Sequence, residues 1–292
     1  GGDSVTLRPE GTAPVCRAYL EHGMHNLPQP VRMYYFCPVF RYERPQAGRF
    51  RQHHQFGIEV IGDADPSVDA EVVELAWQLM NSLGLTDINL LVNSIGDDEC
   101  RPQYISGLKA YYTGHYAELC QDCRNRLERN PLRLLDCKVQ ACRTLGESAP
   151  RSVDQLCPDC QQHWDKFLSY LRAMNIRFNI DHRLVRGLDY YTRTVFEIQP
   201  GDVGGQSTIC GGGRYDKLIE QLDGKHTPGI GFGSGIERLT LNLKRAEIAV
   251  PDEPKPTFMV INVGEAARPV SYTHLRAHET EADLVCRLLL EK

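Results

Sequence analysis

Arginines are concentrated in one short segment of a chain whose formal net charge is −5. Residues 40–59 read FRYERPQAGRFRQHHQFGIE and end in an isolated carboxylate, Glu59. Arginine side chains hold carboxylates and phosphates through paired hydrogen bonds, and two of them around one phosphate can stabilise the charge that develops during its transfer. The segment predicts either a site for a phosphorylated ligand or an exposed hairpin with surface ion pairs, each worth about 0–1 kcal/mol. The four arginines are Arg41, Arg44, Arg49 and Arg51.

Two glycine-rich segments lie further along the chain. GGGRYD at 211–216 is not followed by GK[ST], and GIGFGSG at 229–235 has Ser234 where the last glycine of G-x-G-x-x-G would stand, so neither common nucleotide-binding loop is supported. Glycines spaced by two in a strand let another backbone or a flat ligand approach closely. Arg238, at the start of the following helix, could then lie over that ligand.

Six of the eleven cysteines fall between positions 120 and 160. In a reducing compartment such a cluster is more typical of metal binding than of disulfides. Two C-x-x-C pairs could give four thiolates to one tetrahedral Zn²⁺, with Cys137 and Cys142 as a third pair and free thiols as the alternative. The predicted zinc ligands are Cys120, Cys123, Cys157 and Cys160. Partner spacing is lacking for four cysteines that we expect to pack in the core, namely Cys16, Cys37, Cys100 and Cys210.

Composition limits the class of protein to which the chain can belong. With 292 residues, 41% hydrophobic and 24% charged, the chain is typical of a soluble globular protein of roughly two domains. No apolar run approaches the ~18 residues of a membrane span, and the N-terminus lacks the features of a signal peptide. We therefore expect a cytoplasmic protein with no membrane partner. Its acidity argues against a general nucleic-acid coat, although a local basic patch can still bind phosphate.

Short β-rich runs and one clear helix make up residues 1–96. In the helix after Asp65, Ser67 or Asp69 could serve as the cap and Gly84 could end it. Its predicted apolar face is formed by Val72, Leu75, Ala76 and Leu79. Because strands follow one another without strict strand–helix alternation, we expect an α+β fold with an antiparallel sheet.

Changes in composition divide the rest of the chain. A helical, cysteine-bearing insertion is predicted over 97–174, and a second part of the β-rich core over 175–250. The proline-rich segment 251–256 is a predicted linker, and 257–268, with a buried strand at 258–263, is the predicted start of a further domain.

Both ends of the chain are unusual. The first residue is glycine, so we expect an N-terminal truncation. Reverse translation of Val270–Thr280 and of Leu284–Lys292 gives DNA that resembles sequencing adapters. We expect residues 269–292 to be non-native read-through, the alternative being a natural amphipathic tail.

Four segments, in order, resemble the motifs of histidyl-tRNA synthetases, which are class II aminoacyl-tRNA synthetases. The resemblance covers roughly residues 5–268. It implies a class II synthetase catalytic core, mainly an antiparallel sheet flanked by helices, with an inserted helical subdomain. The chain would be truncated at both ends, lacking motif 1 and most of the anticodon-binding domain, so the fragment could be inactive. The segments are LRPEGT, FRYERPQAGRFRQHHQFGIE (motif 2), LVRGLDYYTRTVFE (the histidyl signature peptide) and GIGFGSGIERL (motif 3).

The resemblance implies a histidine–tRNA ligase that uses ATP and Mg²⁺ to convert histidine to histidyl-adenylate and then transfers the histidyl group to tRNA(His). The full-length protein would be a homodimer. Arg41 would bind the α-phosphate and the histidine carboxylate, and Arg49 the outer phosphates. Arg186 would supply catalytic charge at the α-phosphate, and Arg238 would cap the triphosphate and adenine.

The amino-acid pocket is also implied by the resemblance. Glu10 and Thr12 match residues that hold the ammonium group of the substrate, and Arg186 would stand beside its carboxylate. The rest of the implied pocket consists of Gln55, Glu59, Tyr190 and Tyr191. For the two tyrosines, plain core packing is the alternative.

Two other functions compete with this interpretation. A regulatory subunit of the ATP phosphoribosyltransferase of histidine biosynthesis shares this fold and senses histidine, but such a paralogue should have lost the motif arginines, which all remain here. A zinc-ribbon nucleic-acid-binding module would explain only residues 120–160.

Overall fold

The computed structural model describes residues 2, 5–42, 50–201, 208–250, 264–266 and 269. The chain divides into two units, Gly1–Ile248 and Ala249–Lys292, and the described helices and strands lie in the first. Arg44, Arg49, the predicted linker and strand at 251–263, and the predicted non-native residues from 270 onward lie outside the described residues.

Across the described ranges, seven strands form one sheet in the order β1-β2-β7-β6-β5-β3-β4. Neighbouring strands are antiparallel except β3 and β4, which are parallel. The predicted α+β fold, a mainly antiparallel sheet flanked by helices, is confirmed. The strands are β1 Val31–Phe40, β2 Gln52–Ile61, β3 Ile88–Ser94, β4 Asn179–Ile180, β5 Thr192–Pro200, β6 Cys210–Arg214 and β7 Gly229–Gly235.

The arginine-rich segment connects the first two strands. β1 and β2 pair from Val31–Ile61 to Phe40–Gln52, and β2 then pairs with β7. β1 is the edge strand, and its outward-facing Tyr34 and Phe36 are 85% and 67% exposed.

The helices lie beside and beyond this sheet. None of the described helices is both long and apolar enough to cross a membrane. Their bounds are α1 Thr12–Glu21, α2 Pro66–Ser82, α3 Arg101–Gly114, α4 Gln121–Arg129, α5 Gln140–Glu147, α6 Pro158–Ala173, α7 Leu218–Gln221 and α8 Ile236–Arg245, with 3-10 turns at Met24–Asn26, Tyr116–Glu118, Pro131–Leu134 and Ser152–Asp154.

Helix α2 differs from its prediction in cap and face. Asp65, rather than Ser67 or Asp69, is the cap, because its Oδ1 accepts the Ser67 amide at 2.8 Å. Leu75, predicted to be buried, is 45% exposed, and the buried side chains of the helix include Val73 and Met80 beside the predicted Val72 and Ala76. Gly84, with φ +89°, follows the helix as predicted.

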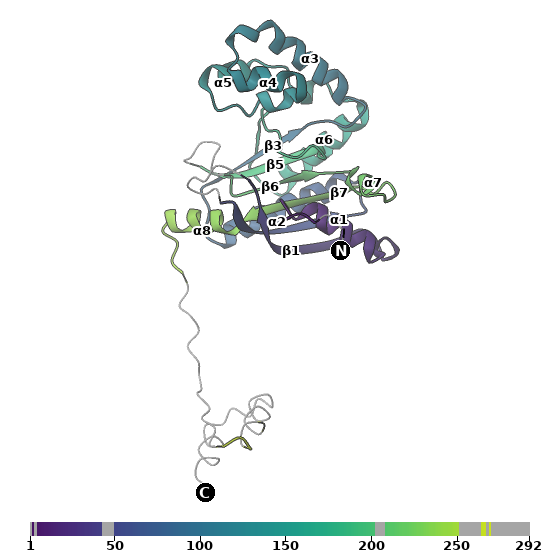
Figure 1. Cartoon of the computed structure of the whole chain (residues 1–292), viewed down its shortest axis with the longest axis vertical. Helices are drawn as coiled ribbons and strands as arrows, with labels where there is room; N and C mark the ends of the chain where they lie inside the picture. The colour runs from purple at the N-terminus through teal and green to yellow at the C-terminus, as the bar shows by residue number, and fades with distance from the viewer. Residues whose placement is uncertain are drawn as a thin grey trace. The chain divides into compact units, whose positions relative to one another are not determined.

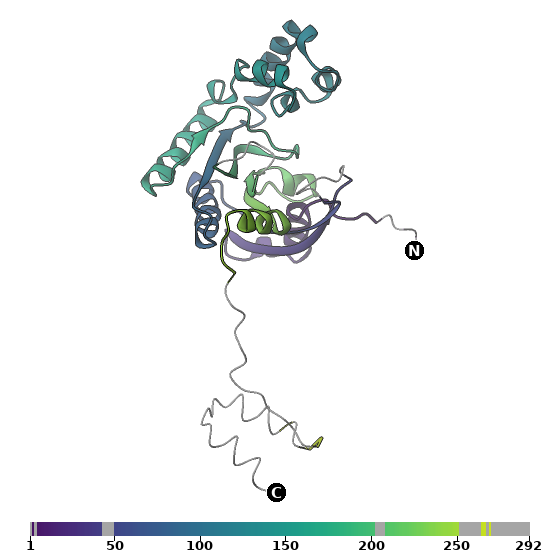
Figure 2. The same cartoon turned by 90° about the vertical axis from the view of Figure 1, so that its left-hand side faces the viewer.

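Two hydrophobic cores are separate. α6 falls within the predicted insertion, yet its buried Trp164, Phe167 and Leu171 join α2 and the sheet in the main core. The second core is formed mainly by residues 104–149, around Tyr112 and Leu134, with partly buried Val185 packed against it. In Figures 1 and 2, helices α3–α5 accordingly lie beyond the β3 side of the sheet, away from β1.

A fully buried ion pair joins the sheet to two helices. Arg214 at the end of β6 donates through Nε to Asp69 Oδ1 of α2 at 3.0 Å, and its Nη1 donates to Asp216 Oδ1 at 3.0 Å. His163 of α6 lies 2.8 Å from the other Asp69 oxygen. Burial alone would raise the pKa of Asp69, but the Arg214 charge and His163 hold that pKa at about 2. Asp69 is therefore ionised wherever the protein is folded near neutral pH.

Replacing Arg214 by methionine should destabilise the fold by about 3–5 kcal/mol, because Asp69 would remain buried without its counter-charge. Urea unfolding at pH 7 measures this loss. The double change Asp69→Leu with Arg214→Met should recover part of it, and exposed Arg17→Ala should cost under about 0.5 kcal/mol. A cost below about 1 kcal/mol for Arg214→Met would contradict this account.

The ion pair between Asp69 and Arg214 also makes the stability of the fold depend on pH under acidic conditions. Since the folded pKa of Asp69, about 2, lies below the ordinary value of 3.8, its stabilisation is present above pH 3.8. About 2 kcal/mol should be lost as the pH falls from there toward 2.

Candidate active site

Two neighbouring polar cavities, of ≈ 230 Å³ and ≈ 1070 Å³, open beside the centre of the sheet. Three of the predicted arginines, far apart in sequence, line both cavities. The shared lining residues are Arg41, Arg186, Leu188, Tyr191, Glu197, Thr208 and Arg238. The cavities are thus positively charged where they meet, as a phosphate site requires.

Arg41 is held where the hairpin meets the N-terminal segment. Its Nε donates to the Pro9 carbonyl at 2.8 Å, and its amide donates to the Arg51 carbonyl at 2.8 Å. The Phe40 amide in turn donates to the Arg8 carbonyl at 2.8 Å. These contacts fix the LRPEGT segment against the end of β1.

The other two arginines lie in the segment before β5 and in α8. Arg186 Nη1 donates to Glu197 Oε1 of β5, and the guanidinium lies 5.8 Å from the Tyr191 ring centre. Within the described part of the chain, its buried Nε has no hydrogen-bond partner. Arg238, in the first turn of α8, donates from Nη1 to the Thr208 carbonyl at 3.1 Å. Both arginines line the cavities, and each donates a hydrogen bond to a neighbouring protein group.

Glu10 caps helix α1 while lining the smaller cavity. Its Oε2 and Oε1 accept the amides of Thr12 and Ala13 at 2.6 and 2.8 Å. Tyr190 donates to the same Oε2 at 3.3 Å. Glu10 therefore places a carboxyl group at this wall, held by the first amides of the helix.

Glu59 is fully buried on β2. Thr12 Oγ1 donates to its Oε1 at 2.7 Å, and the Tyr215 hydroxyl donates to its Oε2 at 2.5 Å. Burial raises the pKa of Glu59 to about 8, against the lowering effect of these two hydrogen bonds. At neutral pH the free carboxyl is therefore largely protonated.

Glycines of β7 make room for the polar side chains of β2. A Cβ on Gly231 would lie 1.8 Å from Glu59 Oε2, and one on Gly233 would lie 1.8 Å from Gln55 Nε2. The side chains of Gln55 and Glu59 lie across β7 because Gly231 and Gly233 have no side chains that would occupy this space. The close approach predicted for the glycine-rich strand is thus made by protein side chains.

Gln55 and His53 complete the polar wall. Buried Gln55 Oε1 and His53 Nδ1 have no hydrogen-bond partner among the described residues, and both side chains line the smaller cavity. Burial, together with the Arg41 charge, lowers the pKa of His53. Unpaired buried polar atoms are costly, so this wall is suited to a polar ligand.

A sequence model of the family described as histidyl-tRNA synthetase matches residues 1–97 and 110–239. The chain belongs to the histidyl-tRNA synthetase family. A histidine–tRNA ligase of Dehalococcoides mccartyi is 60% identical over 91% of this chain and 64% of its own length. One from Desulforamulus reducens is 50% identical over 94% of this chain and 66% of its own length. The chain thus spans just under two thirds of these curated relatives.

A solved structure gives the same assignment. Apo histidyl-tRNA synthetase of S. aureus matches with a TM-score of 0.71 and 38% identity, covering 96% of this chain and 68% of that one. The predicted class II synthetase core is confirmed. The regulatory-paralogue alternative is less supported, because the close relatives are named histidine–tRNA ligase.

Two residues of the site, Tyr215 and Glu197, were not predicted from the sequence. Tyr215 follows the GGGR strand and reaches Glu59, and Glu197 holds Arg186 while accepting the Thr208 hydroxyl at 2.8 Å. Tyr190 and Tyr191 do lie at the pocket, with ring centres 4.8 Å apart. The RYD triplet, with an aromatic hydroxyl directly after a glycine strand, was the available signal for Tyr215.

The four predicted zinc ligands are not brought together by this synthetase-family fold. Cys120 and Cys123 lie with Cys137 and Cys142, whereas the second pair belongs to another group. That group comprises Asp97, Cys100, Cys157 and Cys160. Helix α6 packs on the main core rather than with α4, which separates the two C-x-x-C pairs. Cys100, predicted to be a packing residue, is therefore also part of a cluster.

The stability of the folded chain should depend on pH through Glu59. Its folded pKa of about 8 lies above the ordinary 4.5, so stability is greatest below pH 4.5 and is lost as the pH rises toward 8. Glu59→Gln lacks this titration. The stability of the variant relative to the parent should therefore rise by about 1 kcal/mol per pH unit over this range. Urea unfolding at several pH values measures the difference, and parallel profiles would refute the assignment.

Proposed function

We propose that the protein containing this chain is a histidine–tRNA ligase, which activates histidine with ATP and transfers the histidyl group to tRNA(His). The supporting observation is the convergence of Arg41, Arg186 and Arg238 on cavities whose wall also carries Glu10. Family membership adds to this, since the named relatives are ligases of that kind.

In the proposed reaction the histidine carboxylate attacks the α-phosphorus of ATP in line, and pyrophosphate leaves. Two anions must meet, so positioning and positive charge supply most of the rate enhancement. Arg41 would hold the carboxylate and α-phosphate together, Arg186 would stabilise charge at the α-phosphate, and Arg238 would cap the triphosphate. Arg49 is proposed to contact the outer phosphates. No side-chain nucleophile is needed.

Mg²⁺ would neutralise the outer phosphates when ATP binds. The carboxylates that line the smaller cavity already accept hydrogen bonds from the protein. Glu10 accepts two helix amides, Glu197 accepts Arg186, and Glu237 accepts the His54 amide at 2.9 Å. We therefore assign the ion no protein ligand and derive no step through it.

Recognition of histidine would use the buried polar wall. Glu10, with Thr12, is placed to hold the ammonium group near α1. Gln55 would pair with polar atoms of the substrate, and Tyr190 and Tyr191 would enclose its ring. Glu59 is fully buried and is not among the lining residues of either cavity, so it would act through Thr12, whose hydroxyl donates to it. A buried site that pairs with ring nitrogens penalises analogues that lack them, because its own polar groups would then be left unpaired.

We further propose that the full-length protein is a cytoplasmic homodimer. The edge strand β1 presents Tyr34 and Phe36 to solvent at 85% and 67% exposure. Large exposed aromatics in a row on a sheet edge are typical of an interface.

Histidine-dependent ATP–pyrophosphate exchange tests the proposal. In a protein that extends this chain to the length of its relatives, exchange should require histidine, and Arg186→Ala should slow it by about 10²–10³-fold. Arg17→Ala, whose side chain is 66% exposed, serves as the matched control and should retain full activity.

The outcomes separate the candidate functions. Exchange that persists in Arg186→Ala would remove the role given to that arginine. A folded dimer that binds histidine without exchange would favour the regulatory paralogue.

A further inference from the structure

Seven of the ten described cysteines lie in two compact groups, and the ligand atoms in each group all lie within 4.8 Å of one another. The first group, here the insertion cluster, is Cys120, Cys123, Cys137 and Cys142. The second, here the junction cluster, is Asp97, Cys100, Cys157 and Cys160. Neither cluster takes part in the proposed reaction.

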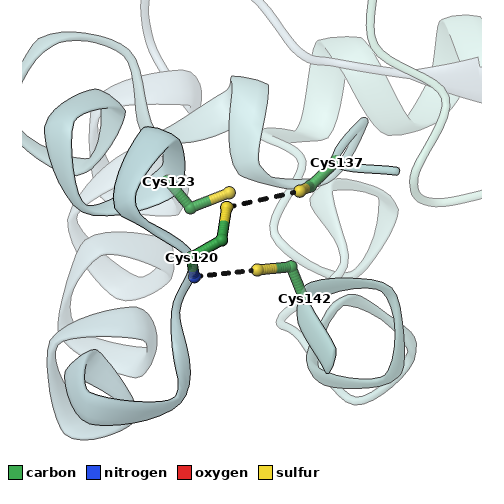
Figure 3. A group of neighbouring side chains, drawn as sticks. All are labelled: Cys120, Cys123, Cys137 and Cys142. Atoms are coloured by element: carbon green, nitrogen blue, oxygen red, sulfur yellow. Dashed lines mark hydrogen bonds between the residues drawn. The ribbon is translucent and has the colours of Figure 1, made fainter. Parts of the chain in front are cut away.

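The insertion cluster has the geometry of a tetrahedral thiolate site (Figure 3). Cys120 precedes α4 and Cys123 lies in its first turn, while Cys137 and Cys142 come from the facing loop and α5. Cys120 Sγ and Cys137 Sγ are 3.9 Å apart. A zinc ion with bonds of about 2.3 Å to sulfur needs edges of about 3.8 Å. The Cys120 amide donates to Cys142 Sγ at 3.3 Å.

The junction cluster repeats the helix-start arrangement with a mixed donor set. Cys157 precedes α6 and Cys160 lies in its first turn, while Asp97 and Cys100 precede α3. Asp97 Oδ1 lies 3.6 Å from Cys100 Sγ and 3.8 Å from Cys157 Sγ, and it also accepts the Glu99 amide at 3.0 Å.

We propose that the chain binds two structural zinc ions, one through the four thiolates of the insertion cluster and one through three thiolates and the Asp97 carboxylate of the junction cluster. Tetrahedral zinc accepts both donor sets. The pairing differs from the single site expected from sequence, since each C-x-x-C pair takes its partners from a different part of the fold.

Charge around the junction cluster supports an anionic metal site. Zinc with three thiolates and one carboxylate carries a net charge of −2. Arg101 and Arg193 both interact electrostatically with Asp97 and Cys160, and Arg193 Nη2 lies 3.4 Å from Asp97 Oδ2. An outer-shell partner of this kind orients a metal-binding carboxylate.

The junction cluster also adjoins the segment that carries Tyr191. Arg101 Nη2 donates to the Tyr191 carbonyl at 2.6 Å, the Arg193 amide donates to the Gly96 carbonyl at 2.7 Å, and the Ile95 amide donates to the Arg193 carbonyl at 2.8 Å. A metal at this cluster would therefore brace the wall of the cavity, while one at the insertion cluster would close the insertion core.

Metal content tests the proposal directly. The chain, purified with a phosphine reductant and without a polyhistidine tag, should contain two equivalents of zinc by mass spectrometry. Cys37→Ser, outside both clusters, should retain both. A folded protein with one equivalent or none would overturn the two-site assignment.

Variants with one cluster altered distinguish the two donor sets. Cys100→Ser and Cys137→Ser should each lose one equivalent. X-ray absorption should then find four sulfur ligands around the zinc left in Cys100→Ser, and three sulfurs with one oxygen around that left in Cys137→Ser. The reverse pattern, or identical spectra, would overturn the assignment of ligands to sites.

Hydrogen exchange at backbone amides tests whether the junction cluster braces the cavity wall, and it does not rely on activity. If either variant folds poorly, the parent protein with and without zinc supplies the comparison. Removing zinc from the parent with a chelator should speed exchange at the Ile95 and Arg193 amides at least tenfold. Cys137→Ser, which alters only the insertion cluster, should leave both amides unchanged in the metal-bound protein. Unchanged protection after full zinc removal would overturn the bracing.

Discussion

The ion pair between Asp69 and Arg214 is the constraint on which the site depends. It is fully buried, and it joins helix α2 to the end of β6, where the next residue is Tyr215. Tyr215 then donates to Glu59 on β2. The Asp69–Arg214 pair, together with His163 of α6, therefore fixes the backbone from which the Tyr215 hydroxyl reaches Glu59. Because breaking such a pair leaves a buried charge, the main core and the pocket are stabilised together.

A second constraint is the run of glycines in β6 and the alternating glycines along β7. Arg186 Nη1 lies 2.6 Å from the position that a Cβ on Gly211 would take, much as Glu59 and Gln55 lie over Gly231 and Gly233. Charged and polar groups therefore lie flat against the middle of a sheet, a place normally filled by apolar packing. Glycines lower the tendency of a segment to form a strand. The sheet tolerates them because β6 and β7 are each paired with a strand on both sides.

Local sequence patterns predicted local structure, but they could not predict which residues far apart in the sequence pair with one another. A helix was predicted after Asp65 and α2 is found there. The motif resemblance grouped Arg41, Arg186 and Arg238, which line the same two cavities. Asp69 was read as a helix cap because its partner Arg214 is 145 residues away. The cysteine pairs were recognised by their spacing, but which pair meets which depends on helix packing that no spacing encodes. Glu197 is the last residue of the quoted signature segment, but its contact with Arg186 could not be predicted, because that contact depends on how the segment folds over β5.

The chain leaves the main core for the insertion and returns to it at almost the same point, since Asp97 Oδ1 and Cys157 Sγ are only 3.8 Å apart. Residues 98–156 therefore form a closed excursion with its own core. Lengthening such a loop costs little, about 0.6 kcal/mol of closure free energy per doubling. Evolution can consequently resize this lobe without moving a strand, but only where its residues do not line the larger cavity, as Arg133, Asp136 and Lys138 do.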